Sequence, residues 1–383
     1  MPKYDYIIIG AGASGLLLAD ALGSDDFFKN KKILLLDKLD KTQNDRTWCF
    51  WEQERGPFDE ILSKSWPNIR FEGEKINQKS DLSPFQYKML RGFDFYQYYL
   101  ERISTYSNVQ FIQERIDSTL EHNTHVEVIG EKHTYETKYV FDSRFDYKKL
   151  LLQSKYPVLQ QHFLGWFVKT DKPVFDSKTA TFMDFAIPQR GNTRFMYVLP
   201  LSENEGLLEY TLFSEHPLEK EEYENAIKDY LDSKLDTTSY EITEVEQGNI
   251  PMTCFDFSKE NTTRVLKIGI AGGWAKASTG YTFYSSTKKV KQLVEFLKSG
   301  RSLSKFSRKT RFWFYDLLFL DVLYKNNHLG RQVFESLFKN RSPQLVLKFL
   351  HEETTLNEEL KVMWACPKMP FVKALFNRLF RLS

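Results

Sequence analysis

An apolar strand, a glycine-rich turn and an apolar helix follow one another at the start of the chain. The turn carries Gly10, Gly12 and Gly15 in the spacing Gly-x-Gly-x-x-Gly. In a dinucleotide-binding unit the first glycine makes the tight turn, the second lets the backbone approach a pyrophosphate, and the third lets the helix pack against the strand. A second apolar strand, residues 32–37, ends at Asp37, where an acid would accept a hydrogen bond from a ribose hydroxyl. The succession predicts an α/β fold that begins with a Rossmann-like dinucleotide-binding unit.

The choice of dinucleotide rests on fewer observations. Asp37 would repel a 2′-phosphate, which disfavours NADP at this site and leaves FAD and NAD. The motif opens the chain, as it does in many flavoproteins, and this resemblance favours FAD. A glycine turn without a ligand would not account for the strand, turn, helix, strand and acid together.

The composition is that of a foldable globular protein. Of the 383 residues, 42% are hydrophobic and 27% charged, and the length allows two or three lobes. The three cysteines, Cys49, Cys254 and Cys366, are too widely spaced for a metal or redox pair, which suits a reducing cytosol. His122 and His125 lie in a polar turn, so a surface loop is favoured over a metal site and no metal is expected. We expect no signal peptide and no membrane span.

Charge is unevenly distributed along the chain. The net charge is +2, but residues 301–383 hold 15 Lys+Arg against 7 Asp+Glu, a net of +8, which leaves −6 for the rest. A basic C-terminal region on a slightly acidic body suggests an anionic surface as partner. Nucleic acid is not expected, because no helix-turn-helix, finger or aromatic RNA-binding pattern is present. A membrane face is the remaining candidate.

A segment rich in tryptophan follows the second strand. Residues 45–51 read Asp-Arg-Thr-Trp-Cys-Phe-Trp, which we interpret as a loop. Arg46 is placed to clamp the pyrophosphate or cover a flavin. The alternative is an aromatic surface loop with no ligand.

The order of elements suggests three parts. Residues 1–150 and 240–300 form a discontinuous dinucleotide-binding domain, 151–239 a strand-rich substrate domain, and 301–383 a helical region. The second stretch of the binding domain carries glycines after a short strand, and these are candidate cofactor contacts: Gly269, Gly272, Gly273 and Gly280.

Glu209 is the strongest candidate for a catalytic acid. It lies in a predicted strand, residues 207–213, where Leu207 and Thr211 share its face. Burial among apolar neighbours would raise its pKa and keep it protonated near neutral pH. The alternative is an edge-strand glutamate that faces water or pairs with an arginine. Asp184, a lone acid between large apolar residues, is a weaker candidate of the same kind.

Six short segments occur in the order seen in lycopene cyclases, and the resemblance runs from about residue 4 to residue 284. They are the glycine turn at 10–15, the tryptophan-rich segment at 45–51, Met-Asp-Phe at 183–185, Phe-Met-Tyr-Val-Leu-Pro at 195–200, Leu-Glu-Tyr-Thr at 208–211 and Ala-Ser-Thr-Gly-Tyr at 277–281. The chain resembles the bacterial lycopene beta-cyclase family. That family is similar in fold to flavin monooxygenases and geranylgeranyl reductases, although Ile270 stands where most of them have an aspartate.

The resemblance implies an intramolecular lyase, an isomerase without net redox change. Glu209 would protonate the acyclic end group of lycopene, and the cation would close to a β-ring, giving γ-carotene and then β-carotene. Reduced FAD would be present but not consumed, with NADPH as the reductant. Two alternatives remain open: a redox flavoenzyme, either a prenyl-chain reductase or a monooxygenase, and a flavin-binding protein of the membrane surface without chemistry.

The C-terminal residues 370–382 predict a basic amphipathic helix. Phe371, Val372, Leu375, Phe376, Leu379 and Phe380 fall on one face, with Lys373, Asn377, Arg378 and Arg381 on the other. A carotene would have to be drawn from lipid, so we expect this helix and the 308–324 segment to dock on a membrane. The expected location is cytoplasmic, at the inner face of the cell membrane. The alternative is a helix packed on the core with a solvated basic face.

Overall fold

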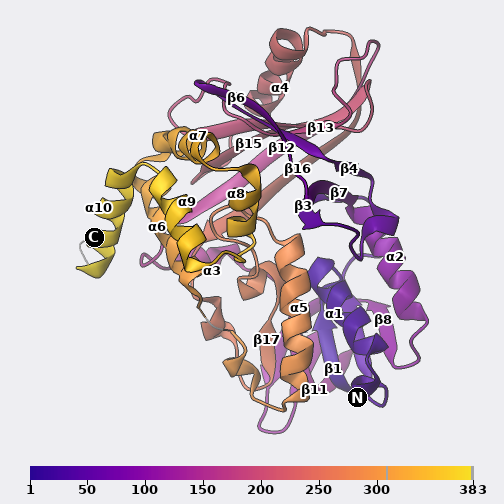
Figure 1. Ribbon diagram of the computed structural model, residues 1–383. Helices are drawn as coiled ribbons and strands as arrows, with labels where there is room; N and C mark the ends of the chain where they lie inside the picture. Colours follow the sequence, from indigo (N-terminus) through magenta and orange to yellow (C-terminus); the bar gives the residue numbers. More distant parts are fainter. Residues whose placement is uncertain (308, 381–383) are drawn as a thin grey trace.

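The computed structural model describes residues 1–307 and 309–380 (Figure 1). Within these ranges, two seven-stranded sheets and one three-stranded sheet form the framework, and the C-terminal helices lie along one side of it. The predicted α/β class is confirmed. In the described part of the chain, no helix has both the length and the hydropathy that crossing a bilayer requires.

The first sheet is built around the strand that leads into the glycine turn. Five strands run parallel in the order β8–β2–β1–β11–β17, and β10 and β9 continue antiparallel from β11. Their bounds are β1 Lys3–Ile9, β2 Ile33–Asp37, β8 Val109–Gln113, β9 Ile116–Glu121, β10 Val126–Gly130, β11 Thr134–Asp142 and β17 Val265–Lys267. Helices α1 (Ala13–Ser24), α2 (Gly92–Ser104) and α5 (Phe283–Lys298) share one apolar core with it. Because both faces of the parallel part are covered, β1 and β2 read as continuous apolar runs.

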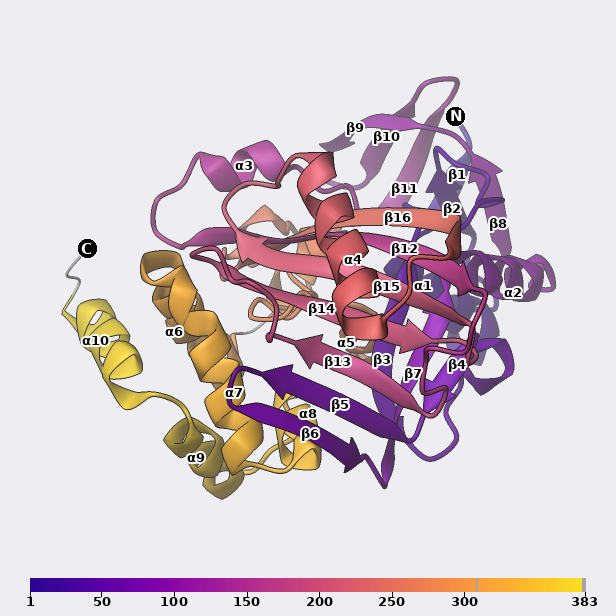
Figure 2. The ribbon, with the colours of Figure 1, turned by 90° about the horizontal axis from the view of Figure 1, so that it is seen from above.

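The second sheet has the order β16–β12–β15–β14–β13–β5–β6 and is antiparallel except where β13 meets β5. Its strands are β5 Asn68–Gly73, β6 Ile76–Asp81, β12 Val158–Thr170, β13 Thr179–Asp184, β14 Thr193–Pro200, β15 Glu205–Ser214 and β16 Tyr240–Thr253. Helix α4 (Lys220–Leu235) lies across one face (Figure 2). The predicted hairpin at 194–213 and the helix at 219–235 are thus present as β14–β15 and α4.

Strand β16 carries a bulge where it pairs with β12. Phe167 pairs with Glu244 and Val168 pairs with Ile242, so Thr243 has no partner residue opposite it. The Thr243 hydroxyl donates a hydrogen bond to the Phe167 carbonyl oxygen over 3.2 Å. One extra residue changes the face to which the rest of a strand points.

The predicted loop at 45–51 is wrong for most of its length. Residues Thr47–Gln53 form strand β3, which pairs with β7 (Phe85–Arg91), and β7 also pairs with β4 (Lys64–Trp66). The strand forms because Phe50 and Trp51 are buried in two different apolar clusters, on either side of it. Of residues 45–51, Asp45 and Arg46 alone lie outside the strand.

The sheets also correct the predicted domain boundaries. Strands β5 and β6 belong to the second sheet although they lie within residues 1–150, and β16 joins it although it lies within 240–300. Strand β6 alternates half-buried with exposed residues, and β16 is mostly exposed or half-buried before its last three residues, so pairing with distant strands, not local hydrophobicity, places them.

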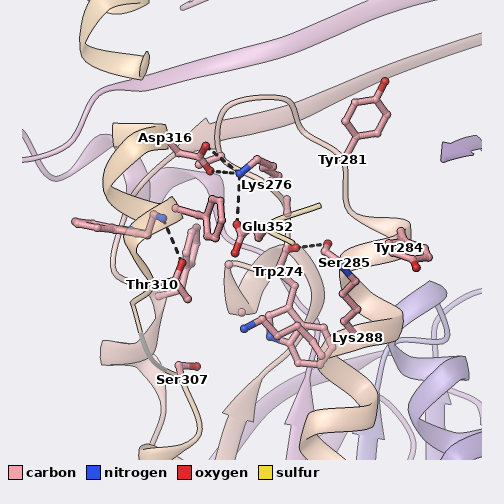
Figure 3. Close-up of a pocket in the computed structure, with 18 of the residues that line it drawn as sticks. Trp274, Lys276, Tyr281, Tyr284, Ser285, Lys288, Ser307, Thr310, Asp316 and Glu352 are labelled. Carbon is pink, nitrogen blue, oxygen red and sulfur yellow. Dashed lines mark hydrogen bonds and ion pairs between the residues drawn. The ribbon is translucent and has the colours of Figure 1, made fainter. Parts of the chain in front are cut away.

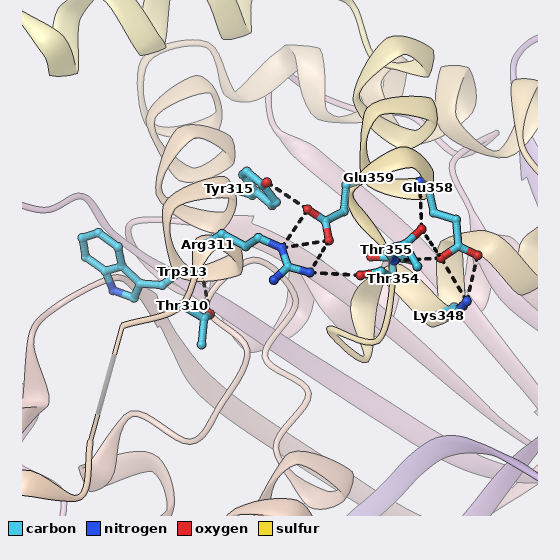
Figure 4. A network of polar contacts seen from close by, with 9 residues as sticks. All are labelled: Thr310, Arg311, Trp313, Tyr315, Lys348, Thr354, Thr355, Glu358 and Glu359. Atoms are coloured by element: carbon cyan, nitrogen blue, oxygen red, sulfur yellow. Dashed lines mark hydrogen bonds and ion pairs between the residues drawn. The ribbon is translucent and has the colours of Figure 1, made fainter.

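The C-terminal helices form a layer against the second sheet (Figures 1 and 2). They are α6 Arg311–Lys325, α7 Gly330–Asn340, α8 Pro343–Leu350, α9 Leu356–Ala365 and α10 Lys368–Leu379; a short helix, α3 (Tyr147–Leu151), precedes β12. Figure 4 shows how α6 and α9 are joined: the Arg311 guanidinium donates to both carboxylate oxygens of Glu359, and the Tyr315 hydroxyl donates to the same group over 2.9 Å. This contact fixes the position from which α10 continues.

Candidate functional site

A cavity of about 400 Å³ lies between the carboxyl ends of the parallel strands and the face of the second sheet opposite α4. The first sheet contributes the glycine turn at Gly12–Gly15, and the second contributes side chains of β12, β14, β15 and β16. Ligands in open α/β sheets bind outside the carboxyl ends of the strands, so the location is that of a cofactor site.

The glycine turn has the geometry that the motif predicts. Gly10 has φ +101°, a conformation that favours glycine. A Cβ on Gly15 would lie 1.9 Å from the Gly10 carbonyl oxygen, so the approach of α1 to the strand excludes any side chain there. Gly12 is the N-cap of α1 and supplies no side-chain cap, which leaves the first N–H groups of the helix free for an anion.

A second helix start faces the same cavity. Thr282, the N-cap of α5, makes no side-chain cap hydrogen bond. The two helix starts are joined by a buried hydrogen bond of 2.9 Å between the hydroxyls of Ser14 and Ser286. Two positive helix ends at one cavity suit a ligand with negative charge at more than one point.

Two buried polar atoms on the cavity wall have no partner within the described residues: Gln161 Oε1 on β12 and the Thr279 hydroxyl. Gly280 lies beside them with φ +71°, and a Cβ there would lie 2.6 Å from Gln161 Oε1. Buried polar groups are costly when unpaired, so these atoms are suited to the polar edge of a bound ring system. The uncapped helix starts, the glycine cradle and the unpaired atoms together fit FAD.

Asp37 has a different role from the one predicted. Its carboxylate accepts hydrogen bonds from the Ala11 and Leu39 N–H groups over 2.6 and 2.9 Å, and Lys41 Nζ lies 3.2 Å from it. It therefore ties the glycine turn to the end of β2 and does not line the cavity. Because Lys41 offsets its charge, Asp37 is also a weaker argument against a 2′-phosphate than the sequence suggested.

Arg46 lies where the sequence placed it. It lines the cavity together with Gly12 and Gly15, and its guanidinium makes a bidentate pair with Asp45 over 2.9 and 3.0 Å. The Asp45 carboxylate also accepts the Tyr96 hydroxyl over 2.7 Å, which holds the ion pair at the cavity edge. Arg46 thus places a positive charge at the part of the cavity that the glycine turn also lines.

The four glycines of the later segment divide between two cavities. Gly269 and Gly280 line the first, with Ile270 beside them. Gly272 and Gly273 line a second cavity of about 600 Å³, which shares Cys49, Tyr281 and Phe283 with the first.

In Figure 3 the ammonium of Lys276 lies between Asp316 and Glu352, at 3.0 and 3.3 Å. Basic side chains outnumber acidic ones in the lining of this second cavity, five to three: Lys276, Lys288, Lys289, Lys309 and Arg311 against Asp256, Asp316 and Glu352.

Glu209 projects from β15 into the first cavity, on the face opposite α4. Its neighbours by period two, Leu207 and Phe213, belong to the apolar cluster on that face, as predicted. The Thr211 hydroxyl donates a 2.8 Å hydrogen bond to the carboxylate. Burial raises the pKa of Glu209 well above its usual 4.5, and the charge of Glu246 raises it further. The carboxyl is therefore held in the protonated form of a general acid.

Glu246 is a functional residue that the sequence did not reveal. Gly165 on β12 pairs with Glu209 of β15 on one side and with Glu246 of β16 on the other. On its far side, Glu209 pairs with Tyr197 of β14. These four residues form one row across four strands, on the cavity face. Burial also raises the pKa of Glu246, although the Thr47 hydroxyl and Arg91 oppose the shift. The polar sequence around Glu246 gives no signal for a buried carboxylate.

An aromatic wall stands beside Glu209. The Tyr197 and Tyr281 hydroxyls are 3.3 Å apart, and Tyr87 lines the same cavity. Tyr210, the next residue along β15, instead points to the α4 side and accepts a hydrogen bond from Arg194. Of the two tyrosines near Glu209 in the sequence, only Tyr197 faces the cavity.

Asp184 is wrong as a catalytic candidate. It is fully buried, but on the α4 side of the sheet, where the Tyr230 hydroxyl donates to it over 2.9 Å and Lys234 lies at 3.7 Å. The Ala186 N–H donates to its other oxygen over 2.7 Å. Its carboxylate therefore anchors α4 to β13 and does not reach the cavity.

The last helix presents the predicted apolar face, but to solvent. Val372, Phe376 and Leu379 of α10 are 56, 52 and 67% exposed, and Trp364 at the end of α9 is 71% exposed. Arg378, predicted on a solvated basic face, instead pairs with Asp321 of α6 over 2.5 Å. The apolar face is thus divided: Phe371 and Leu375 are half-buried, and Val372, Phe376 and Leu379 are exposed. Arg308 and Arg381 lie outside the described residues.

Comparison with solved structures shows the fold. A flavoprotein/dehydrogenase from Cytophaga hutchinsonii aligns with a TM-score of 0.64 at 13% identity, covering 99% of this chain and 100% of that one. A geranylgeranyl bacteriochlorophyll reductase-like protein from Thermoplasma acidophilum gives 0.60 at 12% identity, covering 98 and 99%. A mutant of the halogenase PltM in complex with FAD gives 0.61 at 12% identity, covering 99 and 93%. These neighbours confirm the Rossmann-like FAD-binding fold.

Sequence comparison identifies the family. No curated protein sequence matches the chain. The model of the family described as "Lycopene cyclase protein" matches residues 5–376, nearly the whole chain. The protein is therefore a flavoprotein of the carotenoid cyclase type and belongs to the lycopene cyclase family.

Proposed function

We propose that the protein is a lycopene beta-cyclase, which closes the acyclic end groups of lycopene to β-rings with reduced FAD. The observation that carries the proposal is the placement of Glu209. A half-buried carboxyl with a raised pKa faces the same cavity as the glycine turn and the two uncapped helix starts. Acid and cofactor site thus share one enclosed space, as an acid-catalysed reaction at a flavin requires.

The chain's own residues account for the protonation and ring closure. Glu209 donates its proton to the terminal double bond of the end group, which leaves a tertiary cation. The neighbouring double bond attacks that cation and closes the ring, and a proton then leaves to form the β-ring double bond. The faces of Tyr197 and Tyr281 stabilise the cation by roughly 0.5–2 kcal/mol each. Reduced FAD, when bound, supplies a negative charge that stabilises the cation in this water-poor cavity.

The residues proposed to hold FAD line the cavity on both sides, most of them around the glycine turn and one, Gln161, on β12 of the second sheet. The α1 N–H groups after Gly12 would bind the pyrophosphate, with Arg46 as a counter-charge. Gly269 and Gly280 let the backbone pass close to the flavin, and Gln161 and Thr279 provide polar partners for it. Asp37 supports this arrangement indirectly, because it fixes the turn.

NADPH is the proposed reductant that keeps the flavin reduced. The second cavity is the candidate for its approach, because it adjoins the first at Tyr281 and Phe283. Its lining has an excess of two basic side chains, which suits phosphate groups better than a hydrocarbon.

A membrane surface is the proposed source of substrate. The exposed apolar side chains of α9 and α10 gather at the C-terminal end of the chain, and Lys368 lies 3.6 Å from the centre of the Trp364 ring. Aromatic, aliphatic and basic side chains together are typical of an interfacial helix. We propose that the protein binds the inner face of the cell membrane through this surface and takes lycopene and related acyclic carotenes from it.

Expression in a bacterial strain that accumulates lycopene, followed by pigment chromatography, tests the proposal. Conversion of lycopene to β-carotene is expected. A single-ringed product would mean that only one end is cyclised. Unchanged lycopene in the presence of soluble, FAD-loaded protein would contradict the proposal.

A redox flavoenzyme is the second candidate, because the solved neighbours include a reductase-like protein and halogenases. NADPH consumption separates the two functions. A reductase or monooxygenase consumes NADPH in step with product, whereas the cyclase needs only enough to reduce its flavin.

A further inference from the structure

The cyclisation proposed above, on which this inference rests, moves two protons: one is added to the chain end and one leaves the new ring. Glu209 provides the first. A second group must accept the proton that leaves, and it has to lie within reach of the same end group. Glu246 is a carboxylate of the same cavity wall that the reaction has not yet used.

The two carboxylates are separated by one glycine. Gly165 pairs with both glutamates, so the three residues lie side by side on adjacent strands. A Cβ on Gly165 would lie 3.5 Å from the Glu209 Cβ and 3.4 Å from the Glu246 Cγ. Since neighbouring strands are about 4.8 Å apart, the two glutamate Cα atoms are about 10 Å apart. Leu207 borders the same space, because its Cδ1 would lie 2.9 Å from a Cβ on Gly165, and the part of the cavity between the two carboxyl groups is the hollow over Gly165.

Neither carboxylate has a cationic partner. Among residues 1–307 and 309–380, no ammonium or guanidinium lies within ion-pair distance of Glu209 or Glu246. Glu246 is 9% exposed and accepts a single hydrogen bond, over 2.7 Å, from the Thr47 hydroxyl. The charge of Glu246 disfavours ionisation of Glu209, so the pair keeps a proton more readily than two separate carboxylates would.

The surroundings decide which of the two carries that proton. Arg91 pairs with Glu244 over 2.5 Å on the Glu246 side, and its charge favours the ionised form of Glu246. Glu244 opposes this effect in part. The other titratable groups facing the pair are neutral near pH 7, because burial raises their pKa values: Cys49, Tyr87, Tyr197 and Tyr281. Glu209 is thus the protonated member and Glu246 the ionised one.

We propose that Glu246 accepts the proton that leaves the ring, so that the end group reacts in the hollow over Gly165 between a donor and an acceptor. In the first proton transfer, the O–H bond of Glu209 breaks and a C–H bond forms at the end group of lycopene. In the second, the new ring's C–H bond breaks, its electron pair becomes the ring double bond, and the proton binds Glu246. Glu209 is then the carboxylate and Glu246 the acid. The proton then returns from Glu246 to Glu209 within the cavity, and no oxidant or reductant is consumed.

The test compares purified, FAD-loaded wild type with Glu246→Gln, Glu246→Asp and Glu241→Gln. Glu241 is exposed on the same strand and provides a matched control. Lycopene is supplied in phospholipid vesicles with NADPH, and initial rates are measured against pH. We expect Glu246→Gln to lose at least ~100-fold in kcat with little change in KM or FAD content. Glu241→Gln should match the wild type.

The conservative variant separates a proton acceptor from a structural residue. Glu246→Asp keeps a carboxylate at a greater distance, so the second proton transfer becomes slower. We expect an increased kinetic isotope effect with lycopene deuterated at the carbon that loses the proton. A structural role would change FAD content or KM and leave the isotope effect at the wild-type value.

Two outcomes would overturn the inference, and they are distinguishable. An active wild type together with wild-type kcat and pH profile in Glu246→Gln removes Glu246 from the reaction and leaves the proposed function intact. A wild type that does not cyclise lycopene removes the proposed function and the role of Glu246 with it.

Discussion

Glu209 and Glu246 lie in register on either side of Gly165, so a single glycine separates the two carboxylates of the cavity. Each reaches this position from a different strand, and neither is paired with a cation within the described residues. The arrangement explains how one wall of the cavity can both give and take a proton.

Replacing the acid should stop the reaction without removing the cofactor. Glu209→Gln keeps the shape of the side chain but has no carboxyl proton to donate. We expect a loss of at least ~100-fold in kcat, with FAD content unchanged, measured by product formation and flavin absorbance. Glu205→Gln, an exposed position on the same strand, is the matched control and should be fully active. Cyclisation by Glu209→Gln would remove Glu209 as the proton donor.

The raised pKa of Glu209 also predicts how stability depends on pH. The folded protein binds this proton more tightly than the unfolded chain, in which the pKa is near 4.5. The stabilisation is present below that pH and is lost as the pH rises through the raised value. Thermal unfolding of wild type and Glu209→Gln from pH 5 to 9 should therefore show a steeper loss of Tm in the wild type. Parallel curves would mean that the carboxyl is not held protonated.

A larger side chain at position 165 should keep the substrate's end group out of the space between Glu209 and Glu246. A Cβ on Gly165 would come within 2.9 Å of Leu207 Cδ1, which can move, so Gly165→Ala should keep part of the activity. Gly165→Val places further methyl groups between the carboxylates, and we expect kcat/KM to fall by roughly 100-fold. Flavin absorbance serves as the control for folding. Full activity of the valine variant would show that the end group does not react over Gly165.

The exposed face of α10 should govern membrane binding. Val372→Glu and Phe376→Glu each remove an apolar group worth about 1.5–3 kcal/mol when buried, so vesicle binding should weaken about tenfold or more per substitution. Flotation with anionic phospholipid vesicles measures this. Leu120→Glu, which changes a 50% exposed leucine on β9 of the first sheet, is the control and should bind like the wild type. Activity on detergent-dispersed lycopene should be the same in all three.

The sequence predicted those parts of the molecule that local pattern determines. The glycine turn follows from spacing, and the cavity face of Glu209 follows from the alternation along a strand. Asp184 shows the limit of the same reasoning: a lone acid in an apolar strand is buried as expected, but on the α4 face, and only the position of α4 reveals this.

Glu246 could not be found in this way. Its strand is polar and pairs with β12 across a long separation in the sequence, so its burial depends on what the other sheet places above it. The protein partners of Asp37 could not be predicted for a related reason, because Ala11 and Lys41 are set by the turn and not by the motif. Strand β3 was missed because its burial comes from apolar clusters assembled by distant segments.

The bulge at Thr243 has a consequence for the chemistry of the whole cavity. Before it, Ile242 shares a face with Val168 on the α4 side; after it, Glu244 and Glu246 share the cavity face with Phe167. If the same sequence paired with β12 without a bulge, Glu246 would lie opposite Leu164 on the α4 face and turn its carboxylate away from Glu209. Thr243 therefore sets which side chains of β16 can exchange protons in the cavity, although it is not one of them.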